Sequence, residues 1–169
     1  MPRPYPEPGQ PDWASRHRAL YLSSGGTAGH VMDLRPVGGH RFTTHCLLRL
    51  AGRRTGRTVI TPLIYGAAGG EVLVVASNGG SDRHPAWYRN LRAHPTLRFQ
   101  IATQAFEATW REPEAPERQR LWDFMVALFP PYATYRAATD RRIPLVALRA
   151  VAAAPVFAVQ EETHHERLG

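Results

Sequence analysis

Short runs of apolar and β-branched residues, separated by turns rich in glycine and proline, dominate the middle of the chain. Residues 45–50, 58–65 and 71–76 each have the length and composition of a β-strand. The first two flank a glycine-bracketed turn, which predicts a hairpin. The third is apolar at nearly every position after Glu71, which is typical of a central strand.

Further along the chain, residues 96–102 and 106–110 predict a second antiparallel pair, and residues 143–151 are expected to close the sheet. Six to seven short strands joined by hairpins, with few helices between them, favour a mainly β fold: an antiparallel barrel with peripheral helices. A Rossmann sheet is disfavoured, because no G-x-G-x-x-G segment opens a helix after a strand.

Periodic apolar positions also predict three helices outside the sheet. The first is expected to begin at Asp12 as its cap, to carry Trp13 and His17 on one side, and to end at Gly25-Gly26. Residues 81–93 have helical spacing as well. A loop is expected over residues 27–43.

The third predicted helix runs from Pro116, a residue suited to a first helical position, to Phe129. Pro130-Pro131 breaks it. A short turn is then expected to carry Tyr132 and Tyr135.

At 169 residues the chain has room for one domain and an ordinary core, since 43% of its residues are hydrophobic. We expect a disordered proline-rich arm over residues 1–11, a single barrel domain over 12–159 and a polar tail over 160–169. No secretory signal is expected, and the tract 143–159 is too short and too interrupted to span a bilayer. The lone Cys46 excludes an intrachain disulfide and suits a cytoplasmic location.

The formal net charge of +7 has three possible explanations: plain solubility, an anionic small-molecule ligand, or nucleic acid. Nucleic-acid binding is disfavoured, because the arginines are dispersed and no recognised module accompanies them. The eight histidines complete no plausible set of metal ligands, so no metal is expected.

The segment Gly52-Arg53-Arg54-Thr55-Gly56-Arg57 is the strongest sign of an anionic ligand. It places three arginines on one turn, where fixed cations and free backbone N–H groups can meet a single anion. A solvated hairpin tip is the alternative reading.

Several separated segments of this sequence resemble the deazaflavin-dependent nitroreductase family, whose members use reduced coenzyme F420. The resemblance covers about residues 21–151. It rests on these segments in order: YLSSGGTAGH (21–30), GRRTG (52–56), TPLIYG (61–66), ASNGG (76–80), HPAWYRNL (84–91), PYATY (131–135) and TDRRIP (139–144).

The family resemblance implies a split β-barrel like that of FMN-binding oxidoreductases, with coenzyme F420 as the cofactor. It implies a reductase that passes hydride from the reduced deazaflavin to an electron-poor organic acceptor: an enone, a quinone, an imine or a nitroaromatic. The resemblance also implies a small-molecule partner and a monomeric or homodimeric assembly. Two rival functions remain open, an FMN-dependent split-barrel oxidoreductase and a non-catalytic deazaflavin carrier.

The resemblance also assigns site residues. The turn and two strand ends, with one helix face, are implied to bind the coenzyme: Arg53, Arg54, Thr55, Gly56, Arg57, Thr61, Pro62, Leu63, Ile64, Tyr65, Ala76, Ser77, Asn78, Gly79, Trp87 and Asn90. Tyr132, Tyr135 and Ser77 are implied to face the substrate, where a phenol can orient or protonate it. Packing in the core is the alternative reading for Trp87 and for both tyrosines.

The sequence departs from the family pattern at three positions. Val59 stands where relatives usually carry arginine, and Arg57 is expected to supply that charge from another point of the turn. Asn78 replaces a lysine found in many relatives. Phe129 replaces a frequent tyrosine, which makes the predicted pocket more apolar.

Overall fold

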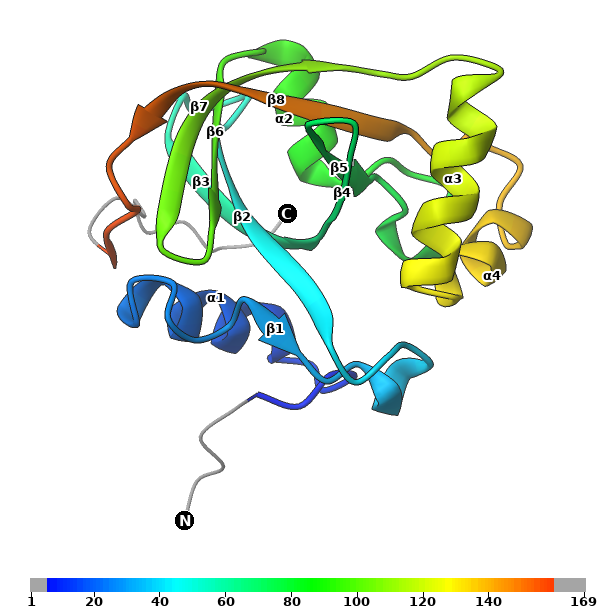
Figure 1. Cartoon of the computed structure of the whole chain (residues 1–169), viewed down its shortest axis with the longest axis horizontal. Helices are drawn as coiled ribbons and strands as arrows, with labels where there is room; N and C mark the ends of the chain where they lie inside the picture. Colours follow the sequence, from blue (N-terminus) through cyan, green and yellow to red (C-terminus); the bar gives the residue numbers. More distant parts are fainter. Residues whose placement is uncertain (1–5, 160–169) are drawn as a thin grey trace.

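The computed structural model of the protein describes residues 6–159 and is built on one antiparallel sheet that curls into a half-open barrel (Figure 1). Its strands are β1 (Val31–Met32), β2 (Thr43–Ala51), β3 (Thr58–Ile64), β4 (Gly66–Ala68), β5 (Glu71–Val75), β6 (Leu97–Ile101), β7 (Gln104–Arg111) and β8 (Leu145–Ala154). The strand order is β1-β2-β6-β7-β8-β5-β4, and β3 pairs with the other edge of β2.

The predicted fold class, mainly β with peripheral helices in a split barrel, is therefore confirmed. The sheet has eight strands rather than the expected six to seven. The two additional strands, β1 and β4, are two and three residues long, too short to produce an alternating pattern.

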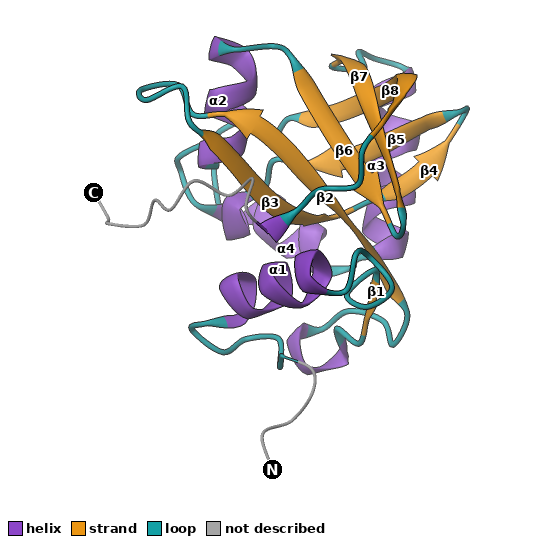
Figure 2. Ribbon diagram, turned by 90° about the vertical axis from the view of Figure 1, so that its left-hand side faces the viewer, coloured by secondary structure: helices purple, strands orange, loops and turns teal. Residues whose placement is uncertain are grey.

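The helices lie around the barrel (Figure 2). They are α1 (Trp13–Ser23), α2 (Ala86–Ala93), α3 (Glu117–Leu128) and α4 (Pro131–Ala137), with short 3-10 turns η1 (Arg35–Val37) and η2 (Asn78–Gly80). Helix α2 begins later than predicted because Pro85 has extended backbone geometry. The turn expected to carry the two tyrosines is instead helix α4, which Pro131 opens as its first residue.

The interior of the barrel is filled by the inward-facing residues of its strands. Leu48 and Leu50 of β2 pack there with Val74 of β5, and Trp87 and Leu91 of α2 join the same cluster. The opposite face of β2 is covered as well, because Leu47 packs with residues of α1. Burial on both faces explains the continuous apolar run that predicted β2.

Helix α1 is fixed to the barrel at its carboxyl end. The hydroxyl of Tyr21 donates to the carbonyl of His45 at 2.9 Å and accepts from the N–H of Ala102 at 2.8 Å. Gly26, just after the helix, has a φ of 89° and lies directly against the backbone of Ala102. These contacts fix the carboxyl end of α1 on the barrel. The amino-terminal half of the helix then lies beside the mouth of the barrel.

The structure describes part of the predicted amino-terminal arm, residues 6–11. Residues 6–11 form turns, and the side chain of Pro6 is buried. Asp12 stands at the start of α1, but its carboxylate makes no capping hydrogen bond and pairs with Arg16 at 3.8 Å. The remainder of the predicted arm and the tail at 160–169 lie outside the described residues. Within residues 6–159, no helix is both long and apolar enough to cross a bilayer.

Candidate active site

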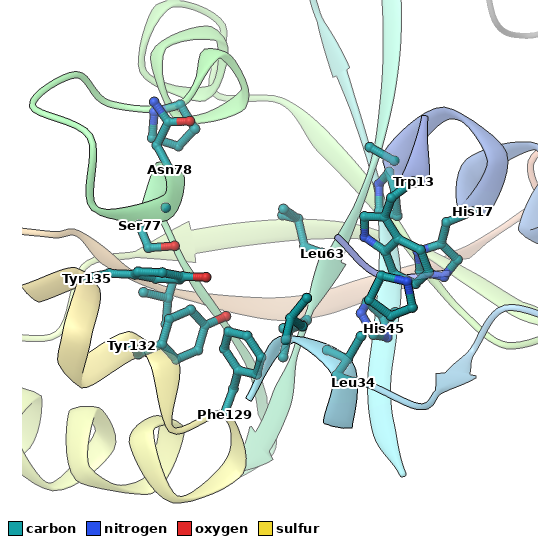
Figure 3. Close-up of a pocket in the computed structure, with 18 of the residues that line it drawn as sticks. Trp13, His17, Leu34, His45, Leu63, Ser77, Asn78, Phe129, Tyr132 and Tyr135 are labelled. Atoms are coloured by element: carbon teal, nitrogen blue, oxygen red, sulfur yellow. The ribbon is translucent and has the colours of Figure 1, made fainter. Parts of the chain in front are cut away.

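A cavity of about 590 Å³ opens between the barrel, α1 and α4. This volume lies within the range of small-molecule sites. Figure 3 shows two unlike walls: Ser77, Asn78, Tyr132 and Tyr135 on one side, and Trp13, His17 and His45 on the other. Leu63 of β3 lies between them.

The first wall carries three hydroxyl groups. Tyr132 and Tyr135 come from α4, with ring centroids 6.3 Å apart, and Ser77 precedes η2. Their hydroxyls point into the same part of the cavity (Figure 3). Burial raises the pKa of Tyr132, so its phenol stays protonated at neutral pH. Phe129 packs edge to face on Tyr132 at 5.0 Å and makes the floor of this wall apolar.

Arg141 fixes the segment that carries Ser77. Its guanidinium donates to the backbone carbonyl of Ser77 at 2.7 Å and to that of Ser81 at 2.6 Å. It also donates to the carbonyl of Ala76 at 3.3 Å. The loop between β5 and α2 is thereby tied to the segment that precedes β8, which keeps the first wall in place.

The arginine turn between β2 and β3 does not line the cavity, but α2 connects the two. Trp87 lines the cavity, and Asn90, one turn later on α2, is turned to the arginines. The amide oxygen of Asn90 accepts from the N–H of Arg53 at 3.1 Å and from its Nη1 at 3.0 Å. Asn90 therefore orients Arg53.

Positive charge accumulates at this turn around Arg53 and Arg54. The pKa of Arg53 lies below its usual value because of partial desolvation and because the cations Arg89 and Arg54 lie nearby. Within the described chain, neither Arg53 nor Arg54 forms an ion pair. Such a cluster is suited to an anionic ligand.

The backbone of the turn offers fewer donors than the sequence suggests. The N–H groups of Gly52 and Gly56 bond within the turn, that of Arg57 bonds to the hydroxyl of Thr55, and that of Arg53 bonds to Asn90. Among the described residues, the N–H groups of Arg54 and Thr55 have no acceptor and are left for a ligand. The turn is therefore suited to an anion mainly through the charges of its arginine side chains.

The second wall was not predicted as part of a site. Trp13 stacks on His17 with ring centroids 4.8 Å apart, and His17 meets the ring of His45 edge to face at 4.7 Å. Trp13 and His17 are four residues apart on α1, so their shared helix face was a usable signal. His45 carried no comparable signal in the sequence, because a single histidine at the start of a strand does not indicate a site.

The predicted site residues divide into two groups. Those that line the cavity are Pro62, Leu63, Ile64, Ser77, Asn78, Gly79, Trp87, Tyr132 and Tyr135. Those outside the lining are Thr61, Tyr65, Ala76, Asn90 and the turn residues Arg53, Arg54, Thr55, Gly56 and Arg57. Tyr65 packs in the barrel core, and its hydroxyl lies 2.7 Å from Nε2 of His30, so it is not positioned to contact a ligand in the cavity.

The fold and the site together are a curled antiparallel barrel with an aromatic, hydroxyl-lined cavity, and a cationic turn linked to that cavity through α2. Comparison with known proteins gives the family. The profile of the F420H2-dependent quinone reductases matches residues 13–150. The chain belongs to this family.

Two curated relatives come from Mycobacterium tuberculosis. The F420H2-dependent quinone reductase Rv1261c is 33% identical over 135 residues, which cover 78% of this chain and 86% of the relative. The putative F420H2-dependent quinone reductase Rv3178 is 33% identical over 103 residues, which cover 61% of this chain and 87% of the relative.

Solved structures agree with the fold. The F420-H2 dependent reductase FDR-A is 36% identical, with a TM-score of 0.57 over 62% of this chain and 93% of its own. A protein described as a domain-swapped dimer is 35% identical, with a TM-score of 0.60 over 82% of this chain and 98% of its own. The predicted enzyme class, an F420H2-dependent oxidoreductase, and the predicted coenzyme are thereby confirmed at the level of the family.

Proposed function

We propose that this protein uses reduced coenzyme F420 to reduce a quinone or a similarly electron-poor acceptor inside the cavity. The proposal rests on one observation: helix α2 connects the cavity to the arginine turn. Trp87 lines the cavity, and Asn90 on the same helix holds Arg53. A ligand with a planar ring and an anionic tail can therefore meet both features at once.

The residues present fit that coenzyme. Arg53, Arg54 and Arg57 would hold the phosphate and the acidic tail, and the cavity has apolar walls for the ring at Pro62, Leu63 and Ile64. When bound, the reduced deazaflavin supplies a hydride. Asn78 and Gly79 at the strand end would contact the ring, in keeping with their place in the cavity lining.

The chain's own residues would complete the reduction by positioning the acceptor and supplying a proton. A quinone that receives a hydride at the ring needs one proton to become a hydroquinone, and a phenol of the first wall is placed to donate it. We assign this role to Tyr135, whose hydroxyl lies beside Ser77 in Figure 3, and a supporting role to Tyr132. Ser77 would hydrogen-bond the acceptor carbonyl.

Coenzyme preference tests the proposal directly. Titration of deazaflavin fluorescence with the protein should saturate at micromolar concentration or below, whereas FMN should bind at least about tenfold more weakly, a difference of about 1.4 kcal/mol. Equal or tighter FMN binding would favour the rival FMN-dependent oxidoreductase. Tight deazaflavin binding without turnover of any quinone, enone, imine or nitroaromatic would favour the carrier.

The arginine turn should contribute most to coenzymes with long polyglutamate tails. Arg53→Ala and Arg54→Ala are each expected to weaken the binding of these forms about tenfold at low salt, because a charge-assisted contact contributes roughly 1.5–3 kcal/mol. The loss should shrink as salt rises. Arg57→Ala tests whether Arg57 replaces the family arginine missing at Val59.

Arg120→Ala is the matched control, since it removes the same charge from the exposed face of α3. If Arg53→Ala and Arg54→Ala change affinity no more than this control does, the turn is a plain hairpin tip. Three further predictions stand untested beside the proposal: a cytoplasmic location, no nucleic-acid partner, and a monomer or homodimer.

A further inference from the structure

Both histidines of the second wall hydrogen-bond to the backbone, which fixes where their protons lie. Nδ1 of His45 lies 3.0 Å from the carbonyl oxygen of Thr43, and Nε2 of His17 lies 2.7 Å from that of Gly29. A carbonyl oxygen only accepts, so each of these nitrogens must carry the hydrogen. The other nitrogen of each ring, Nε2 of His45 and Nδ1 of His17, is therefore a lone pair when the ring is neutral.

Burial keeps both rings neutral. It lowers the pKa of His45 to about 3, helped by the neighbouring rings of His17 and His30, and it lowers the pKa of His17 as well. Tyr21, with its ring 6.2 Å from His17, is the other titratable group in contact. At neutral pH the two histidines therefore add no positive charge to the cavity.

The lone-pair nitrogens belong to residues that line the cavity. Among the described residues neither atom has a hydrogen-bond partner and neither is fully buried, so each retains some accessible surface. Around them lie Leu34, Val37 and the indole of Trp13. An indole donates but offers no lone pair, so His17 and His45 are the hydrogen-bond acceptors among the side chains lining this end.

Two acceptors that have no donor partner among residues 6–159 favour some chemical groups of a ligand over others. A quinone carbonyl brings only lone pairs, so at this end it could accept from the indole N–H of Trp13 but not from either histidine, whereas three O–H groups meet it at the hydroxyl wall. The reacting carbonyl is therefore favoured at the hydroxyl wall. A ligand O–H or N–H group would instead complete a hydrogen bond in a largely apolar surrounding, where an unmatched polar group is costly.

We propose that His17 and His45 select acceptors that carry an O–H or N–H donor on the part of the molecule remote from the reacting carbon. The inference rests on the proposed function, because it assigns orientation to an acceptor in the same cavity. Quinones with a hydroxyalkyl or amine substituent on the distal ring form the expected substrate class.

Two matched ligands test the proposal: a naphthoquinone with a hydroxymethyl group on the distal ring, and its methyl ether. The ether has nearly the same shape but no donor. Calorimetric titration of each into the protein without reduced coenzyme should show the alcohol binding about five- to tenfold more tightly, the scale of one hydrogen bond. In turnover assays the KM for the ether should exceed the KM for the alcohol by the same factor.

Two substitutions replace each ring, and with it the nitrogen that carries the lone pair, while keeping a donor for the backbone hydrogen bond. His45→Asn retains a donor near the position of Nδ1, and His17→Gln retains one near Nε2. At least one of them should bring the alcohol-to-ether ratio close to one. Val37→Ala, a control in the same wall, should change the affinity for both ligands alike and keep the ratio.

Equal binding of the alcohol and the ether to the unmodified protein would overturn the inference, as would a ratio that survives in both histidine variants. Because binding is measured without turnover, this outcome is distinct from failure of the proposed function. The latter would appear as an inability of the coenzyme-loaded protein to reduce either quinone.

Discussion

Replacement of Tyr135 by phenylalanine is expected to lower quinone turnover about 100-fold, the scale on which a positioned general acid contributes. The substitution removes one hydroxyl and keeps the ring that packs with Phe129 and Tyr132. Folding and coenzyme affinity should therefore change little. Steady-state rates with a fixed quinone, together with deazaflavin titrations, would measure both quantities.

The same change at Tyr132 should reduce turnover less, because that ring is buried among Trp122 and Phe129 and serves packing as well. Tyr88→Phe is the matched control: its hydroxyl donates to Glu112 at 2.9 Å, away from the cavity. If Tyr135→Phe, Tyr132→Phe and the double variant all turn over like this control, the tyrosines pack and do not act in the reaction.

Gly26→Ala should destabilise the protein more than any other single methyl addition described here, by about 3–5 kcal/mol in the free energy of unfolding. A Cβ at this position would lie 1.8 Å from the carbonyl oxygen of Ala102 and 2.4 Å from its carbon. Both are backbone atoms, so the end of α1 or the β6–β7 turn must move. Urea unfolding at constant pH would measure the loss.

Gly25→Ala provides the control one residue earlier. Gly25 also has a positive φ, 63°, but a Cβ there would meet no atom within 4 Å. Its substitution should cost only the backbone conformational penalty, about 1–2 kcal/mol. Similar losses for both variants would mean that the close approach of Gly26 to Ala102 is not held in solution.

The strands that dominate the fold were predictable because their patterns are long and continuous. Residues 45–50, 58–65 and 71–76 correspond closely to β2, β3 and β5. The shorter β1 and β4 depend on pairing with β2 and β5, which local sequence does not encode. The proline-linked tyrosines were expected on a turn, but Pro131 begins a helix as readily as it ends one.

The candidate site was predictable where residues close in sequence form it. Ser77, Asn78 and Gly79 occupy one strand end, and Tyr132 and Tyr135 share α4, so each group falls within one short segment of the family resemblance. The link between Asn90 and Arg53 spans 37 residues and arises only through tertiary packing. The second wall likewise joins α1 to the start of β2, and no local sequence pattern predicts that contact.

The two walls of the cavity come from different stretches of the chain. Trp13 and His17 of the second wall precede the sheet in sequence and His45 lies near the start of β2, whereas Ser77, Tyr132 and Tyr135 of the first wall all follow β5. Substitutions at Trp13 or His17 would therefore change one wall of the cavity without altering the sheet.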